Sequence, residues 1–145
     1  MNTTALPMND IYIEDFHRDV AITMIRLYAS FPRPAALYVD DIAGFDDPDE
    51  FGVQSERHQR CLGSLIWLGE EGLIRYRDLI GIEGIDAAVL TLRGFRALHE
   101  GQGPNIEQLT INSIRDALRE RNSEAVKRSV QRLFGSFVMQ RGPDR

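Results

Sequence analysis

The first third of the chain carries apolar residues at the spacing of a helix. Three or four positions separate successive members of the set Phe16, Val20, Met24, Leu27 and Phe31. This spacing places them on one helical face. Pro32 and Pro34 follow and cannot continue a helix. The pattern predicts a helix over residues 10–31, preceded by a loose leader over residues 1–9.

Two further segments come before the next long helix. Residues 35–44 carry apolar positions typical of a short helix, with Asp40 and Asp41 facing solvent. Residues 46–53 combine Pro and Gly with carboxylates, which is the composition of a loop. The carboxylates are Asp46, Asp47, Asp49 and Glu50. They could in principle bind calcium, but their spacing lacks the EF-hand loop and its terminal Glu, so a solvated loop is expected.

A third helix is predicted over residues 55–71. The Ser55 hydroxyl can accept a hydrogen bond from a first-turn amide, and Gly72 can end the helix. At about 100° per residue, one face gathers His58, Cys61, Leu62, Leu65, Ile66 and Leu68. The opposite face gathers Glu56, Arg57, Gln59, Arg60, Ser64, Trp67 and Glu71. We expect the first face to be buried and the second to face outward.

Two short strands and a closing helix are predicted next. Residues 73–77 and 85–92 alternate in the manner of strands, and a connection over 79–84 contains two glycines. This arrangement is typical of a β-hairpin. Residues 91–100 are predicted to form a fourth helix. Thr91 can cap this helix, and Gly94 allows it to approach the sheet closely. Helices beside one hairpin make the predicted fold class α+β.

The C-terminal segment is predicted to be helical. Gly-Gln-Gly-Pro at residues 101–104 is the clearest linker, and residues 105–141 beyond it contain two amphipathic helical patterns. The second pattern has an apolar stripe consisting of Val126, Val130, Leu133, Phe137 and Val138. Burying five such side chains fully contributes roughly 8–15 kcal/mol of gross transfer free energy. The stripe must therefore pack on its own head domain, on another copy, or on a different protein.

Charge is distributed unevenly along the chain. Residues 1–114 contain nine Arg and 18 Asp or Glu, a balance of −9, whereas residues 115–145 contain eight Lys or Arg and four Asp or Glu, a balance of +4. The two sum to the net charge of −5. Such asymmetry suggests a head and a tail with different neighbours. The alternative is that the basic tail docks on the acidic head.

Several classes of protein are disfavoured by the sequence. No stretch approaches about 18 consecutive apolar residues, and the first ten residues lack the features of a signal peptide. The one cysteine, Cys61, cannot form an internal disulfide. Together these observations predict a cytoplasmic protein. The sequence lacks a phosphate loop, zinc-ligand spacing and a nucleophile elbow, so neither an enzyme nor a cofactor is expected.

Residues 62–98 resemble the second half of bacterial winged helix-turn-helix domains. The resemblance is carried by Leu-Ile-Trp-Leu-Gly-Glu-Glu-Gly-Leu-Ile at 65–74 and Leu-Thr-Leu-Arg-Gly-Phe-Arg-Ala-Leu at 90–98. In MarR-like and PadR-like regulators a similar Gly-Leu-Ile closes the reading helix, and a similar Leu-Thr-x-x-Gly opens the helix after the wing. The resemblance implies a three-helix core with a β-hairpin wing over residues 10–100, followed by a C-terminal helical extension.

This resemblance implies DNA binding by a small transcriptional regulator. The reading helix would enter the major groove of double-stranded DNA with Arg57, Gln59, Arg60 and Ser64, and the wing would contribute Arg75 and Arg77. One feature departs from the family pattern. The turn between the second and third helices is usually about 3–4 residues long, whereas here it is longer and carries four carboxylates, which repel phosphates. The alternative is a winged-helix protein-interaction module that binds no nucleic acid.

Two apolar features are the expected partner contacts. Trp67 falls on the polar side of its helix, where an exposed ring would gain from an interface; alternatively, the wing or the C-terminal helices cover it.

A homodimer would present two reading helices to a twofold-symmetric site. Its interface would consist of Val126, Val130, Leu133 and Phe137. Capping of the monomer by the same helices is the alternative, and binding to a membrane surface is disfavoured by the acidic residues nearby.

Overall fold

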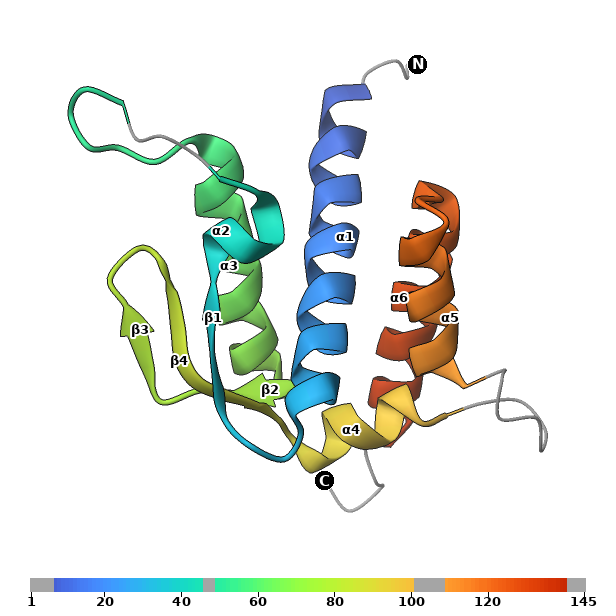
Figure 1. Cartoon of the computed structure of the whole chain (residues 1–145). Helices are drawn as coiled ribbons and strands as arrows, with labels where there is room; N and C mark the ends of the chain where they lie inside the picture. Colours follow the sequence, from blue (N-terminus) through green and yellow to red (C-terminus); the bar gives the residue numbers. More distant parts are fainter. Residues whose placement is uncertain (1–6, 46–48, 101–108, 141–145) are drawn as a thin grey trace.

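The protein combines helices with a small antiparallel sheet. The computed structural model describes residues 7–45, 49–100 and 109–140. In Figure 1, helix α1 stands between α3 and the sheet on one side and α5 and α6 on the other. The predicted α+β class is confirmed. The elements are α1 (Pro7–Ser30), β1 (Ala35–Tyr38), α2 (Val39–Ala43), α3 (Glu56–Glu71), β2 (Ile74–Arg75), β3 (Asp78–Ile80), β4 (Gly84–Leu90), α4 (Leu92–Leu98), α5 (Thr110–Arg119) and α6 (Ser123–Met139).

Helix α1 supplies the centre of the core. Val20, Met24 and Leu27, three members of its predicted apolar face, are fully buried. The helix begins at Pro7, so the prediction of a loose leader is wrong for residues 7–9. A proline in the first turn costs little, because the amide it lacks would have no partner within the helix.

Residues 35–44 do not form the single helix predicted from the sequence. Ala35–Tyr38 form strand β1, and only Val39–Ala43 form helix α2. Leu37 is buried opposite Ile85 of strand β4, about fifty positions later in the chain. Pairing with this distant strand overrides the local preference of the segment for a helix. Asp40 and Asp41 are exposed, as expected.

Helix α3 begins and ends where the sequence predicts. The Ser55 hydroxyl accepts a hydrogen bond from the amide of His58, with 3.2 Å between the two atoms. At the other end, the Gly72 amide donates to the carbonyls of Leu68 and Gly69. Gly72 has a φ of 94°, a left-handed conformation that glycine adopts without steric cost.

Strand β4 lies at the centre of the sheet. It pairs antiparallel with β1 on one edge and with β2 and β3 on the other. The predicted hairpin is therefore confirmed. The connection was predicted over residues 79–84, but the turn covers only residues 81–83. It is shorter because Asp78–Ile80 form strand β3.

Ala87 is strained within β4. It has a φ of 55° at the point where the pairing of β1 with β4 shifts register. A left-handed conformation costs an alanine roughly 1–2 kcal/mol relative to glycine. We expect Ala87→Gly to raise the free energy of unfolding by about 0.5–1 kcal/mol in urea titrations, after the greater freedom of glycine in the unfolded chain is subtracted. The control is Ala88→Gly, on the same strand but without a positive φ, which should lower the free energy of unfolding. If Ala87→Gly also destabilised the protein, Ala87 would not be strained.

Thr91 joins the end of the sheet to helix α4. Its hydroxyl oxygen accepts the Gly94 amide hydrogen at 3.0 Å and lies 2.7 Å from the Gly72 carbonyl oxygen, to which it donates. Gly94 is buried and has no room for a side chain, because a Cβ there would collide with the Leu73 carbonyl oxygen. The predicted cap and the predicted close approach are both confirmed.

The C-terminal helices complete the core of the same chain. Helix α6 packs on α1, α4 and α5. The residues predicted to form a dimer interface are buried within this core; they are Val126, Val130, Leu133 and Phe137. Their prediction as an interface with another chain is wrong, because α1 and its neighbours already cover them. Capping of the head, the alternative, is confirmed, whereas Val138 of the predicted stripe is exposed.

Some predictions fall outside the described residues. They include the linker at 101–104 and two of the loop carboxylates, Asp46 and Asp47. Within the described part of the chain, no helix has both the length and the apolar character needed to cross a membrane.

Candidate functional site

Helix α3 is rotated relative to the orientation predicted from its sequence. Two guanidinium nitrogens of Arg57 each donate to the carboxylate of Asp19 on α1 at 2.7 Å, and a third lies 3.4 Å from Asp15. Asp19 is 1% exposed. These hydrogen bonds raise the pKa of Arg57. The prediction that Arg57 faces outward is wrong, because a buried carboxylate requires a cation beside it.

The other α3 candidates lie in three different environments. Ser64 is buried and donates to the Arg60 carbonyl at 3.1 Å, so the prediction that it faces outward is also wrong. Arg60 is half-exposed, and its guanidinium lies 3.9 Å from the centroid of the Tyr12 ring. Gln59 is exposed and donates to the Gln54 carbonyl at 2.9 Å. Of the four predicted contacts on α3, two keep a solvent-facing side chain.

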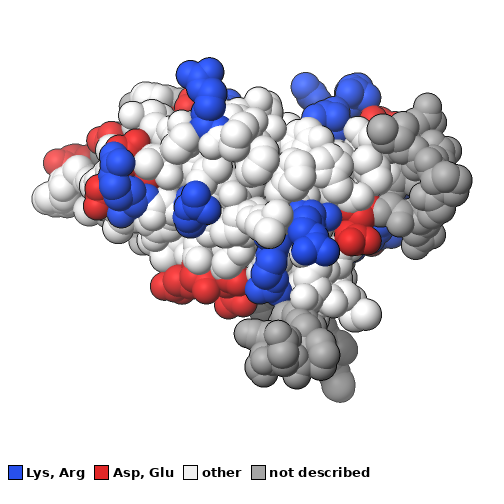
Figure 2. Space-filling model, turned by 90° about the horizontal axis from the view of Figure 1, so that it is seen from below, with Lys and Arg blue, Asp and Glu red and all other residues white. Residues whose placement is uncertain are grey.

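The two arginines of the hairpin are exposed, as predicted. Arg77 lies between two carboxylates, 3.4 Å from Asp78 and 3.4 Å from Asp86. Arg75 follows the far end of α3, roughly 15 Å along the helix axis from the level of Arg60. Figure 2 shows Lys and Arg side chains as separate groups, not as a continuous strip, on the face seen from below. Since Arg57 is paired with Asp19 and Ser64 is buried, the six predicted DNA contacts do not form one exposed surface.

Cys61 lies beside the ion pair of Arg57 and is fully buried, as expected. Burial raises the pKa of its thiol to about 12, because the interior stabilises a thiolate less than water does. We expect the folded protein to resist a chromogenic thiol reagent at pH 8 and to react only as it unfolds. The protein unfolded in urea should react at once. Rapid stoichiometric labelling of the folded protein would contradict this placement.

Exposed apolar side chains gather where α3 faces the hairpin turn. Val53 and Ile82 are each more than half exposed, and Leu62 and Ile66 of α3 lie half-buried between them. They line a hollow of about 470 Å³, which we call the α3 groove. The groove is lined by Gly52, Val53, Gln54, His58, Gln59, Leu62, Gly63, Ile66 and Ile82. The side of α3 that faces the hairpin turn is therefore largely apolar.

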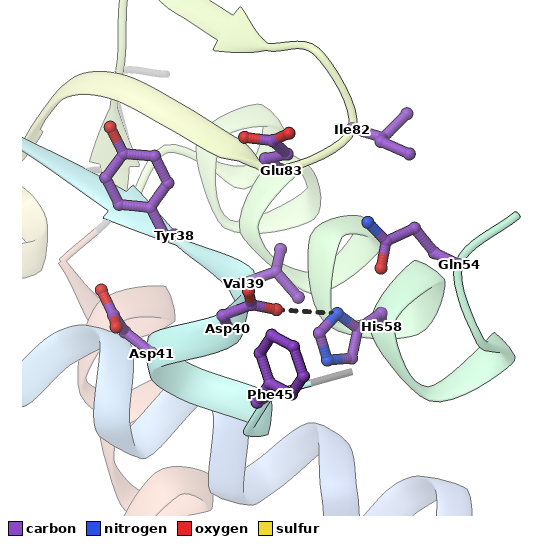
Figure 3. Close-up of a pocket in the computed structure, with 9 residues that line it drawn as sticks. All are labelled: Tyr38, Val39, Asp40, Asp41, Phe45, Gln54, His58, Ile82 and Glu83. Carbon is purple, nitrogen blue, oxygen red and sulfur yellow. Dashed lines mark ion pairs between the residues drawn. The ribbon is translucent and has the colours of Figure 1, made fainter. Parts of the chain in front are cut away.

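A second hollow of about 450 Å³ adjoins this groove, and we call it the acidic cleft. Figure 3 shows its walls, which come from β1 and α2, from the start of α3 and from the hairpin turn. Three of the residues that line the cleft carry carboxylates, and no lining residue is a Lys or an Arg. The cleft is lined by Tyr38, Val39, Asp40, Asp41, Phe45, Gln54, His58, Ile82 and Glu83.

His58 lines both hollows and connects α3 to α2. Its ring is 5% exposed. Nε2 lies 2.6 Å from the Gly44 carbonyl oxygen and Nδ1 lies 3.4 Å from a carboxylate oxygen of Asp40. Since a carbonyl oxygen can only accept, Nε2 donates this bond. The prediction that His58 is buried is confirmed, and its ring holds the two walls together.

Gly63 lies on α3 between two hollows. A Cβ at this position would meet nothing within 4 Å. Gly63 lines the α3 groove on one side and, on the other, a hollow between α1 and α3 that includes Tyr12 and Trp67. Trp67 is 37% exposed and packs edge-on against Phe16 and Phe134. Phe16 of α1 and Phe134 of α6 therefore cover part of the Trp67 ring, and the rest of the ring stays exposed.

Sequence reasoning missed three apolar residues that line the two hollows. Phe45 and Val53 flank the acidic loop, and Ile82 lies at the tip of the hairpin turn. Large apolar residues in loops and turns are a signal of contact, since such positions are usually polar. Asp19 was missed as well. Its position beside Val20, within the apolar face of α1, was the available signal for a buried partner.

The described residues contain no cluster of three or more His, Cys, Asp or Glu that could hold a metal ion. Comparison of the chain with protein-family models, curated proteins and solved structures gave no match. The function must therefore be argued from the geometry of the α3 groove and the acidic cleft.

Proposed function

We propose that this protein is a winged-helix interaction module that binds a partner protein through the α3 groove and the acidic cleft. The order of elements supports a winged helix: three helices with one strand inserted between the first two, followed by an antiparallel hairpin. The caps at Gly72 and Thr91 agree with the resemblance at residues 62–98.

The chemistry of the α3 groove carries the proposal. A helix that reads DNA presents cations and hydrogen-bonding groups to the bases and phosphates. Here Leu62, Ile66 and Ile82 line the groove, and Arg57 is held by a buried carboxylate on α1. Apolar side chains gain by leaving water, and nearby carboxylates repel phosphates. This combination suits a protein surface better than a duplex.

DNA binding by a dimeric regulator is the second candidate. Two observations favour it: the winged-helix order of elements, and the exposure of Arg75 and Arg77 on the hairpin. In this arrangement the hairpin would supply most of the phosphate contacts. The dimer would form through a surface other than the buried stripe of α6.

Two measurements test the proposal. We expect no saturable binding of a mixed-sequence duplex, even at about 50 mM salt, where phosphate contacts are strongest. We also expect the protein to retain one stoichiometric partner in affinity capture, and Ile82→Asp to lose it. Leu92→Asp, an exposed apolar position on α4, is the matched control and should keep the partner. Duplex binding that weakens with Arg75→Ala would overturn the proposal in favour of the second candidate.

A further inference from the structure

The α3 groove and the acidic cleft adjoin each other. Gln54, His58 and Ile82 line both of them. One wall is thus shared, and in Figure 3 Ile82 and Gln54 lie on one side of the cleft, opposite the side formed by Tyr38 and Asp41. A single bound segment that crosses this shared wall can contact both hollows.

The cleft is the negatively charged end of this surface. Asp41 and Glu83 are exposed and form no ion pair with another described residue. Asp40 is half-exposed and faces His58, the one basic side chain among the lining residues. Arg18 donates to the backbone of α2 at Ile42 but does not line the cleft. The carboxylates are therefore not neutralised by the residues that surround them.

Aromatic rings border the same carboxylates. Phe45 is 79% exposed and Tyr38 is 41% exposed. The face of an aromatic ring attracts a cation, and a guanidinium or ammonium with a long apolar stem can contact a ring and a carboxylate together. An exposed phenylalanine is also a large apolar area that a partner would cover. Carboxylates and rings together are the chemistry that recognises Lys or Arg.

We infer that the occupant is a segment of another protein that presents apolar side chains to the α3 groove and a Lys or Arg side chain to the acidic cleft. This inference rests on the proposed function and adds the charge of the partner. A second copy of this chain fits less well, because each copy carries a net charge of −5 and the two would repel.

The experiment uses three helical peptides with the same Leu stripe and with Lys, Gln or Glu at the flanking positions. Their dissociation constants for the full chain are measured by fluorescence anisotropy. We expect the Lys peptide to bind about fivefold more tightly than the Gln peptide, and the Glu peptide to bind most weakly. Asp41→Asn combined with Glu83→Gln should abolish this preference. Glu120→Gln combined with Glu124→Gln removes the same charge between α5 and α6 and should preserve it.

The possible outcomes separate the inference from the proposed function. Equal binding of all three peptides, weakened throughout by Ile82→Asp, would overturn the inference and leave the interaction face intact. Peptide binding that Ile82→Asp does not change would overturn both. If the two double variants reduced the preference for the Lys peptide equally, the peptide would be attracted by the overall negative charge of the protein and not by the cleft. That result would also overturn the inference. A dimer in light scattering that Ile82→Asp dissociates would identify a second copy as the occupant and refute the proposed partner.

Discussion

Arg57→Ala is expected to lower the free energy of unfolding by about 3 kcal/mol. Two nitrogens of this guanidinium donate to Asp19 at 2.7 Å, and Asp19 is almost completely buried on α1. Removing the cation leaves a buried carboxylate without its counter-charge, which costs more than the pair itself contributes. The substitution therefore weakens the attachment of α3 to α1 instead of removing a ligand contact.

Unfolding in urea measures this effect, and three variants serve as controls. Arg60→Ala removes a cation one turn later, but its side chain is 47% exposed, so a loss below about 1 kcal/mol is expected. Arg57→Lys should be intermediate, because an ammonium cannot form two parallel bonds to one carboxylate. Arg57→Ala with Asp19→Ala should cost less than the two single changes added together. If Arg57→Ala kept wild-type stability and instead weakened duplex binding, the outward orientation predicted from the sequence would be correct.

The ends of elements were the most predictable part of this fold. Ser55, Gly72 and Thr91 were each expected to cap a helix, and each does so. The hydrogen bonds of a helix cap join residues within one turn of each other. A short stretch of sequence therefore contains all the chemistry that decides whether a cap forms.

The rotation of α3 could not be predicted from the same stretch. A helical period separates two faces but does not specify which neighbour each face meets. Ser64 can be buried because its hydroxyl bonds to its own helix, and Arg57 can be buried because Asp19 lies 38 positions earlier in the chain. Residues 35–38 depended in the same way on β4, a partner distant in sequence.

The candidate site was hidden for a related reason. Its two hollows combine residues from the loop before α3, from α2 and from the hairpin turn. None of these segments has a motif by itself. The apolar stripe of α6 was recognised, but its partner stayed open, because periodicity alone does not distinguish packing within one chain from packing between chains.

Gly94→Ala is expected to lower the free energy of unfolding by about 3 kcal/mol. A Cβ at this position would overlap the carbonyl oxygen of Leu73, which is backbone and cannot turn away as a side chain would. The same oxygen accepts a hydrogen bond from the amide of Thr91 at 3.1 Å, and the Thr91 hydroxyl oxygen also lies 3.1 Å from it. Moving it would therefore disturb the cap of α4 and the pairing of β2 with β4 together.

Two other glycines give matched controls of the opposite sign. Gly63 on α3 and Gly135 on α6 lie within helices, and a Cβ at either position meets nothing within 4 Å. Alanine at each should raise the free energy of unfolding by about 0.5–1 kcal/mol, because alanine loses less backbone freedom on folding. For Gly94→Ala, a loss of about 3 kcal/mol corresponds to a melting temperature about 10 °C lower. If Gly94→Ala stabilised the protein as Gly63→Ala does, α4 could not lie against the start of the hairpin.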